Sequence, residues 1–480
     1  MMKKLIIIFY IFLTVSCIEL LLSDGESNFV MPSASGATYY VAATGGSNSY
    51  DGSIGSPWAT LQYAFSQLTA GDILYVRGGT YSPSTTYGNN RDNCVYVSGR
   101  NGTSSSRITV SNYPGETPVI TGANLPESNS NKSGIHLYNC DYWTITGLVV
   151  EYIEDTGGTT NFGIGWYIAS SDYITLDQCV SRYNDGPGFA VNGYCNEGYF
   201  IRCDSYWNAD NHDSGGFGDG FIASHYGGDG GYHTYFQYCR AWNNSDDGFD
   251  AFISDSGNNG GYITWEHCWA FNNGKATPSG NGAGIKWGGG SQGLTESGVQ
   301  RIVRYCISAS NKAIGIDQSG SNDPSNAYFI GVLHNNFSYA NGSQGFYNDI
   351  SDASYFRNNI SYGNTGSNWV DQTGFTDDHN SWNGGVTVSS ADFTGLDIDE
   401  LDDARASDGS LPDITSFKLV EGSDLIDAGT ATVYSGMTIT YEGDAPDLGA
   451  FEYGGGSPVY VKTSSGSWVM YNGKRVKITW

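Results

Sequence analysis

The segment Cys239-Arg240-Ala241-Trp242-Asn243-Asn244-Ser245-Asp246-Asp247-Gly248-Phe249 decides the fold, because its pattern recurs through the middle of the chain. Each unit contains a Cys or Asn, an Asn five residues later, and then a Gly followed by an aromatic residue or Ile. Seven successive units supply the first residue, namely Cys179, Cys203, Cys239, Cys268, Cys306, Asn336 and Asn359. The second residue is Asn184, Asn208, Asn244, Asn273, Asn311, Asn341 and Asn364. This fixed offset indicates a repeat architecture.

The length of the units selects the kind of repeat. They are 23 to 38 residues long without helical periodicity, which suits coils of a parallel β-helix better than propeller blades. Stacked coils place equivalent residues about 4.8 Å apart. We expect the Asn column to be an inward ladder that satisfies backbone groups, and the Cys column to be a buried stack of thiols. Cys94, Cys140 and Cys195 lie outside this column, and a disulfide among them stays open. The sequence predicts an all-β, right-handed parallel β-helix.

Both ends of the repeat carry distinctive segments. Residues 39–81 resemble the entry segment of many secreted parallel β-helix proteins, and their short helix is expected to cap the open end of the solenoid. Parts of residues 424–453 resemble the exit segment of the same class. We therefore expect a β-helix domain over residues 37–455. Residues 456–480 are expected to form a tail with one hairpin around Asn472-Gly473, whose role stays open.

The first residues have the pattern of an export signal. Lys3 and Lys4 precede the apolar run 5–13, which is too short to span a bilayer. Cys17 stands in a context that loosely resembles a bacterial lipoprotein cleavage box. Residues 1–17 are therefore expected to be a signal peptide. The mature protein is expected to be secreted, or to be anchored at the outer membrane through a lipid on Cys17.

The charge of the chain constrains its partner. The net charge is -27, and only 15% of the residues are charged. An acidic surface argues against a nucleic acid, because phosphate binding needs a basic face. If the substrate is itself an anionic polymer, a bound divalent cation is the simplest source of local positive charge.

Aligning the coils on the Gly that follows the ladder Asn in each coil brings acidic residues into register. Asp219 and Asp247 each precede that Gly on adjacent coils, and Asp246 stands beside Asp247. Asp250 follows the Gly by two residues. If the chain bends at the Gly, these carboxylates converge, and like charges so close need a cation. All-oxygen ligation favours Ca²⁺ over Zn²⁺, and the carbonyl of Ala251 is a further candidate ligand.

Lys286 occupies the Asp250 position on the next coil. Two roles are open for it: a salt bridge to Asp250 or Asp317, or a general base whose pKa a neighbouring Ca²⁺ lowers. The coils of Asp219 and Lys286 also carry the longest insertions, at 209–219 and 274–283. Such loops beside one face are where binding sites are built, so we expect a functional site here.

Three motifs resemble the family nine polysaccharide lyases, which are pectate lyases with a lysine base on a parallel β-helix. The motifs are Gly218-Asp219-Gly220-Phe221, Asn244-Ser245-Asp246-Asp247-Gly248-Phe249-Asp250-Ala251 and Gly280-Asn281-Gly282-Ala283-Gly284-Ile285-Lys286-Trp287-Gly288-Gly289. The likeness extends over most of residues 39–370. Ile285 and Trp287 depart from the family pattern, in which Phe and Leu are usual.

The resemblance implies a Ca²⁺-dependent lyase that cleaves a pectate-like polyuronate by β-elimination. It implies that Asp219, Asp246, Asp247, Asp250 and the Ala251 carbonyl hold Ca²⁺, and that Lys286 removes the C5 proton. The substrate is then an acidic polysaccharide: polygalacturonate, a rhamnogalacturonan backbone or another uronate polymer. The enzyme is expected to act as a monomer.

Two other functions fit parts of the sequence. A β-helix glycoside hydrolase would use Asp246 and Asp247 as acid and base, without needing Lys286. A non-catalytic, Ca²⁺-stabilised solenoid would bind glycans through exposed aromatic residues, for which Trp166, Trp207 and Trp242 are candidates. The fold alone does not choose among these functions.

Overall fold

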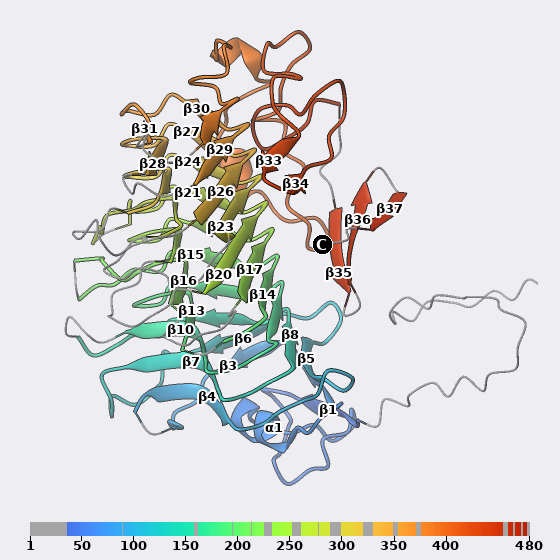
Figure 1. The fold of residues 1–480 in the computed structure, drawn as a ribbon. Coiled ribbons are helices and arrows are strands. Elements are labelled where there is room, and N and C mark those ends of the chain that lie inside the picture. Colours follow the sequence, from blue (N-terminus) through green and yellow to red (C-terminus); the bar gives the residue numbers. More distant parts are fainter. Residues whose placement is uncertain are drawn as a thin grey trace, which may run out of the picture. The chain divides into compact units, whose positions relative to one another are not determined.

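Short parallel strands recur once per coil on each of three sheets, which stack into a parallel β-helix (Figure 1). The computed structural model describes residues 36–454 except 89, 158–161, 194, 213, 225–232, 252–260, 277, 289–298, 320–329, 349–353 and 371–375, together with the backbone of three strands farther on. The predicted signal peptide and Cys17 lie outside the described residues. The predicted parallel β-helix is confirmed.

The ten-stranded sheet that contains Lys286 is called the site sheet. Its strands are β4 (Asp92–Ser98), β7 (Lys132–Tyr138), β10 (Gly163–Ala169), β13 (Phe189–Asn192), β16 (Phe221–Ser224), β19 (Phe249–Asp250), β22 (Ile285–Lys286), β25 (Ile316–Asp317), β28 (Phe346–Asn348) and β31 (Trp369–Val370). Side chains alternate between the two faces of a strand. Ile285 therefore points into the core, where it is 0% exposed, while Lys286 points outward.

Two further sheets complete each coil. The larger one consists of β1 (Thr38–Val41), β2 (Ile73–Val76), β5 (Ile108–Asn112), β8 (Trp143–Thr146), β11 (Thr175–Asp177), β14 (Gly198–Ile201), β17 (His233–Gln237), β20 (Tyr262–Glu266), β23 (Val299–Arg304), β26 (Ile330–His334), β29 (Tyr355–Arg357) and β32 (Thr376–Asp378). The other consists of β3 (Gly79–Tyr81), β6 (Pro118–Thr121), β9 (Val149–Glu151), β12 (Val180–Arg182), β15 (Asp204–Tyr206), β18 (Arg240–Trp242), β21 (Trp269–Phe271), β24 (Ile307–Ala309), β27 (Phe337–Tyr339) and β30 (Ile360–Tyr362).

The Asn ladder holds the corners of the coils. The side-chain amide nitrogen of Asn208 donates to the side-chain oxygen of Asn244 at 3.0 Å. The amide nitrogen of Asn244 donates in turn to the side-chain oxygen of Asn273, also at 3.0 Å. The residue just before each ladder position turns the chain through a positive φ, for example 55° at Asn243. Such corners leave backbone groups unpaired, and the ladder amides satisfy them.

The cysteines behave as the repeat predicts. All eight cysteines from Cys94 to Cys306 are free and buried. The structure therefore contains no disulfide among Cys94, Cys140 and Cys195. The column from Cys179 onward fills the interior with small apolar side chains, and Cys268 N lies 3.4 Å from the sulfur of Cys306 on the next coil.

The N-terminal end of the stack is closed by α1 (Leu61–Gln67), as predicted (Figure 1). Thr60 caps this helix by accepting a hydrogen bond from Tyr63 N. Leu61 and Phe65 are buried, and the Phe65 ring stacks on Trp143 at 5.9 Å. The helix therefore covers the apolar end of the core.

The chain after the last coil runs back over the third sheet. It contains η1 (Ser390–Asp392), η2 (Asp399–Asp402), β33 (Thr432–Tyr434) and β34 (Met437–Thr438). Leu401, Phe417 and Leu448 of this segment are buried in one cluster with Trp269 and Phe337. Polar contacts also hold the same segment to the final coils.

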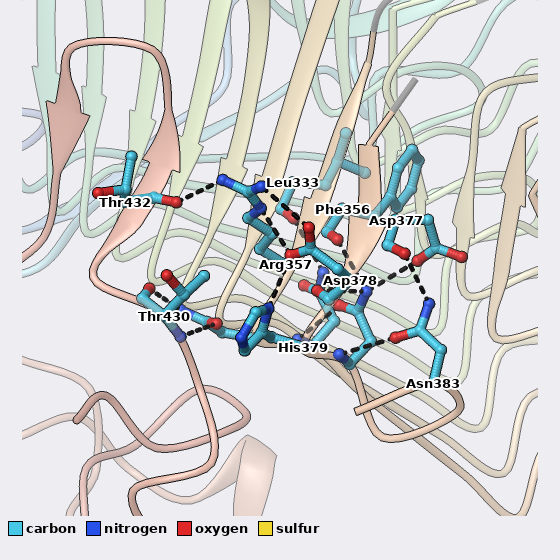
Figure 2. Close-up of polar contacts among 12 residues, drawn as sticks. Leu333, Phe356, Arg357, Asp377, Asp378, His379, Asn383, Thr430 and Thr432 are labelled. Carbon is cyan, nitrogen blue, oxygen red and sulfur yellow. Dashed lines mark hydrogen bonds and ion pairs between the residues drawn. The ribbon is translucent and has the colours of Figure 1, made fainter. Parts of the chain in front are cut away.

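Figure 2 shows how the last coils hold this returning segment. Arg357 forms an ion pair with Asp378 at 2.7 Å and also donates to the carbonyl of Thr432. Asn358 accepts a hydrogen bond from Thr430 N at 2.8 Å. The contacts with Thr432 and Thr430 link residues more than 70 positions apart, so the returning segment covers the end of the stack.

Farther on, the backbone forms β35 (Val459–Thr463), β36 (Gly466–Tyr471) and β37 (Lys474–Lys477), paired antiparallel in that order. Tyr471 is opposite Lys474, so these two strands flank the Asn472-Gly473 pair. Among the described residues, no helix is long and apolar enough to cross a membrane.

Candidate active site

Adjacent coils bring three carboxyl groups together at the edge of the site sheet. Asp219, Asp246 and Asp247 each offer an oxygen, and these three oxygens lie within 4.8 Å of one another. All three residues are at most 4% exposed. The sequence predicted that Asp250 would converge with these acids as well, and the structure groups three of the four.

The predicted columns also have the expected register. Gly220 N donates to the carbonyl of Asp247 at 2.9 Å, which places Asp219 and Asp247 one coil apart. Asp250 pairs with Lys286, and Lys286 pairs with Asp317 on the following strand. The chain bends at the Gly of each coil, so both columns reach one site.

Backbone amides from the turns hold the acids in place. Asp247 N donates to Asp219 Oδ1 at 3.0 Å. Asn281 N donates to Asp246 Oδ1 at 2.8 Å, and Ala283 N donates to Asp247 Oδ1 at 2.6 Å. The last two donors belong to the 274–283 insertion, which therefore builds one wall of the site.

The second insertion packs against the first. Gly215 accepts a hydrogen bond from the hydroxyl of Ser245 at 2.8 Å, and Gly280 N donates to the carbonyl of the same Ser245 at 2.7 Å. Gly215 has a φ of +83°, and a Cβ there would lie 2.6 Å from the carbonyl oxygen of Pro278. The loops 209–219 and 274–283 thus meet over Ser245, beside the three acids.

Lys286 lies between two of the carboxylates. Its Nζ donates to Asp247 Oδ2 at 2.7 Å and lies 3.6 Å from Asp250 Oδ2. The sequence predicted contacts with Asp250 or Asp317, so the closest partner was not anticipated. Asp250 is linked to the three clustered acids through Lys286, and its side chain is 16% exposed.

Burial and like charge shift the pKa values of the acids upward. Burial raises the pKa of Asp219 well above its ordinary value, and the neighbouring Asp246, Asp250 and Asp247 add to the rise. Burial and the charge of Asp247 raise the pKa of Asp246 to about 8. The pKa of Asp247 is also raised, mainly by burial and partly offset by Lys286. A cation bound among carboxylates this close together would stabilise their ionised form.

The pKa of Lys286 is raised, whereas a lysine that acts as a general base needs a lowered pKa. Burial alone would lower it, but the charges of Asp247 and Asp250 and the hydrogen bond to Asp247 outweigh burial and raise it. With the side chains alone, Lys286 therefore keeps its proton. A base at this position requires another cation to neutralise the carboxylates.

The donor set fits Ca²⁺. All the nearby ligands are carboxylate oxygens, which hard cations prefer, and no cysteine or histidine belongs to this group of three acids. Ala251, the predicted carbonyl ligand, follows Asp250 at the end of β19, and its N–H donates to the Lys286 carbonyl at 2.9 Å. The residues present can therefore hold such an ion.

The two departures from the family motif are core residues. Ile285 is 0% exposed and Trp287 is 1% exposed. The backbone carbonyl of Trp287 accepts a hydrogen bond from the buried Arg301 at 2.8 Å. Because both side chains face inward, the departures change the packing behind Lys286 and not the surface around it. Of the three candidate binding tryptophans, Trp166 and Trp242 are buried and Trp207 is 45% exposed.

A second polar cluster was not anticipated. Asp155, Asp185 and His212 each offer a metal-ligating atom within 4.8 Å of the others. His212 Nε2 lies 3.4 Å from Asp155 Oδ1 and 3.2 Å from Asp185 Oδ2. His212 falls in the 209–219 insertion and Asp155 precedes the first Asn of the ladder, so the repeat gave no signal for either residue.

The fold and the site define a class: a parallel β-helix enzyme whose outward sheet face carries a buried lysine among clustered carboxylates. Residues 39–381 match the family model described as "Pel9A-like, right handed beta helix region". The chain belongs to this family, which confirms the right-handed β-helix and the predicted family resemblance, and it is a polysaccharide lyase.

Known relatives cover almost the whole chain. Pectate lyase L of Dickeya chrysanthemi is 31% identical over 450 residues, which are 92% of this chain and 96% of that protein. The crystal structure of pectate lyase Pel9A matches with 28% identity and a TM-score of 0.65, over 87% of this chain and 96% of that one. A structure named rhamnogalacturonan lyase shares the fold at 23% identity, with a TM-score of 0.66 over 80% and 97% of the two chains.

Proposed function

We propose that this chain cleaves a pectate-like polyuronate by β-elimination, with Lys286 as the base that removes the C5 proton. The observation that carries the proposal is the position of Lys286 Nζ, 2.7 Å from Asp247 and 3.6 Å from Asp250, on the outward face of the site sheet. The two relatives named above as pectate lyases support pectate as the substrate class.

The metal requirement is part of the same proposal. Asp219, Asp246, Asp247, Asp250 and the Ala251 carbonyl would hold Ca²⁺. When bound, Ca²⁺ neutralises these carboxylates, draws electron density from the substrate carboxylate and favours the unprotonated form of Lys286. The clustered acids with raised pKa values support this assignment, because their repulsion calls for a cation.

The reaction is balanced without a second acid. The C5–H bond breaks and its proton passes to the neutral Nζ of Lys286. The electron pair forms the C4–C5 double bond, and the glycosidic oxygen leaves C4 with the bonding pair and takes a proton from solvent. The backbone amides of Asn281 and Ala283 keep Asp246 and Asp247 in place during this step. A hydrolase would instead need a water molecule between an acid and a base.

The test is the ultraviolet absorbance of unsaturated product released from polygalacturonate, with Ca²⁺ and with chelator. We expect absorbance that grows with Ca²⁺ and disappears with chelator. The same assay on rhamnogalacturonan decides between the two polyuronate backbones. Reducing sugar released without ultraviolet absorbance, and insensitive to chelator, would replace the lyase with the hydrolase.

We also propose that the enzyme works outside the cell, because the pattern of residues 1–17 supports export and a large polymer does not enter cells. Fractionation of cells expressing the full chain tests this. A Cys17→Ala variant released from the membrane, where the wild type is retained and labelled by fatty acid, would establish the lipid anchor. Equal release of both proteins would establish secretion without one.

A further inference from the structure

The outward face of the site sheet carries one continuous column of residues that extends far from Lys286. Strand register places these residues one above another: Tyr96, His136, Tyr167, Ala190, Ile222, Asp250, Lys286, Asp317 and Tyr347. Around Lys286 the column carries the acids Asp250 and Asp317, and at its β4–β10 end it carries three aromatic rings. Ala190 and Ile222, which lie between them, are small or apolar and place no charge in the path.

The aromatic end of the column lines a surface pocket of about 400 Å³. Its walls include Tyr96, His136, Tyr138 and Tyr167, together with Arg91 just before β4. The His136 ring lies 5.0 Å from the Tyr96 ring and 4.6 Å from the Tyr167 ring. Tyr138 is 44% exposed. Aromatic faces of this kind pack against the apolar faces of sugars.

Among the described residues, the two ring nitrogens of His136 have no hydrogen-bond partner. His136 is 9% exposed, and both of its ring nitrogens are buried. Burial, aided by the charge of Arg91, lowers the pKa of His136 to about 3, so the ring is neutral and has one N–H donor and one acceptor. Buried polar atoms are normally satisfied, so these two nitrogens suit hydroxyl groups of a ligand.

Arg91 supplies a positive charge to the same pocket. Its guanidinium lies over the Tyr167 ring at 4.8 Å and donates to the carbonyls of Lys132 and Phe162 only at 3.4 Å. Within the described residues it forms no ion pair with a carboxylate. Seven other arginines do form such pairs, namely Arg77, Arg182, Arg202, Arg240, Arg304, Arg357 and Arg405. In a chain with a net charge of -27, a guanidinium without an acid partner suits an external carboxylate.

The geometry points to a distal sugar subsite at this pocket, in which Arg91 binds the carboxylate of a uronate residue, His136 binds its hydroxyls and the tyrosines pack on its ring. This subsite rests on the proposed function for the nature of the polymer and extends it to the far end of the site sheet. Tyr167 lies four strands from Lys286, which is about 19 Å at the usual strand spacing. A polymer chain that follows the column would occupy both places, whereas a trisaccharide cleaved at Lys286 would not reach the pocket.

The sharpest variant is His136→Phe, because it keeps the ring shape and removes two nitrogens that bond to nothing in the described protein. Affinity electrophoresis in a polygalacturonate gel measures binding, with both proteins carrying Lys286→Ala so that the polymer is not cut. We expect His136→Phe and Arg91→Gln each to weaken binding by about tenfold, while thermal unfolding shows His136→Phe to be as stable as its parent. Arg182→Gln, which removes the same charge from a different sheet, is the matched control and should not change binding.

Kinetics with Lys286 intact give a second readout. Each pocket variant should raise KM for polygalacturonate about tenfold, leave kcat unchanged and leave kcat/KM for trigalacturonate unchanged. Binding that is the same in parent and pocket variants overturns the subsite, and so does equal damage to polymer and trisaccharide. Failure of wild-type binding to both polygalacturonate and rhamnogalacturonan also overturns it. If the wild type binds polymer through Arg91 and His136 but forms no unsaturated product, the subsite stands and the proposed lyase reaction fails.

Discussion

Lys286 Nζ lies 2.7 Å from Asp247 Oδ2, and the Asp247 side chain is 0% exposed. A buried carboxylate that holds a lysine this closely keeps the lysine protonated, since each charge stabilises the other. In the proposed reaction, Lys286 acts as a base only after a bound cation neutralises Asp247. The proposed metal requirement and the proposed base therefore depend on the same contact.

Removing one charge from the crowded acids should raise the unfolding temperature of the metal-free protein. Asp246→Asn keeps the oxygen that accepts from Asn281 N and removes a charge from a carboxyl whose pKa is raised to about 8. At pH 9 in chelator, we expect the variant to unfold at a higher temperature than the wild type. With saturating Ca²⁺ the order should reverse, because the variant has lost a ligand.

The measurement is thermal unfolding by calorimetry at fixed pH, with Ca²⁺ and with chelator. A variant equally destabilised in both conditions would show that Asp246 acts only as a structural hydrogen-bond acceptor. Asp413→Asn, at an exposed carboxylate paired with Lys418, is the control and should leave the Ca²⁺ dependence unchanged.

The segment that covers the last coils should make stability depend on pH. Burial, with added repulsion from Asp447, raises the pKa of Glu452 to about 8 from an ordinary value of 4.5. The folded chain therefore favours the protonated carboxyl. The stability that this contributes is fully present below the ordinary pKa and is lost as the pH rises through about 8.

Glu452→Gln removes this titration. Thermal unfolding temperatures measured from pH 5 to pH 9 should decline less for the variant than for the wild type, and the difference should grow toward alkaline pH. Parallel curves for the two proteins would mean that Glu452 does not titrate in this range.

The ladder carries much of the stability of each coil. Asn273 accepts from Asn244 and donates to the Ala241 carbonyl and to Asn311, each at 3.0 Å. Asn273→Ala leaves several buried groups unpaired, and we expect a loss of about 3 kcal/mol in the free energy of unfolding. Asn124→Ala, at an exposed asparagine bonded to Ser82, should cost less than about 0.5 kcal/mol. Denaturant unfolding of both variants gives these values, and equal costs would refute the special role of the ladder.

Residues that recur once per coil could be placed from the sequence, whereas contacts and residues outside the repeat could not. The positions of Asn244 and Cys239 could be predicted because equivalent residues recur once per coil. The columns that contain Asp219 and Lys286 follow from the same register. The contact between Lys286 and Asp247 crosses from one column to the other at the bend beside Gly248, and register alone does not give the direction of a long side chain. Arg91 and His136 precede the first ladder residue, so no repeat marked them.

Parts of residues 424–453 were identified as an exit segment, but the packing of the returning C-terminal segment on the third sheet was not predicted, for a related reason. Phe417 and Leu448 pack on the third sheet through irregular chain, and contacts of that kind leave no periodic pattern. The short helix at the other end was predicted, because residues 39–81 resemble known entry segments.

Replacing Lys286 with arginine tests whether this lysine removes the C5 proton. Lys286→Arg keeps the positive charge beside Asp247 but does not lose its proton at accessible pH. The measurement is the rate of unsaturated product formation from polygalacturonate at saturating Ca²⁺, for wild type, Lys286→Arg and Lys286→Ala, after thermal unfolding has shown that all three are folded. We predict that both variants lose activity by at least about a thousandfold. A Lys286→Arg enzyme within a few-fold of the wild type would rule out Lys286 as the base, because a group that stays protonated would then suffice.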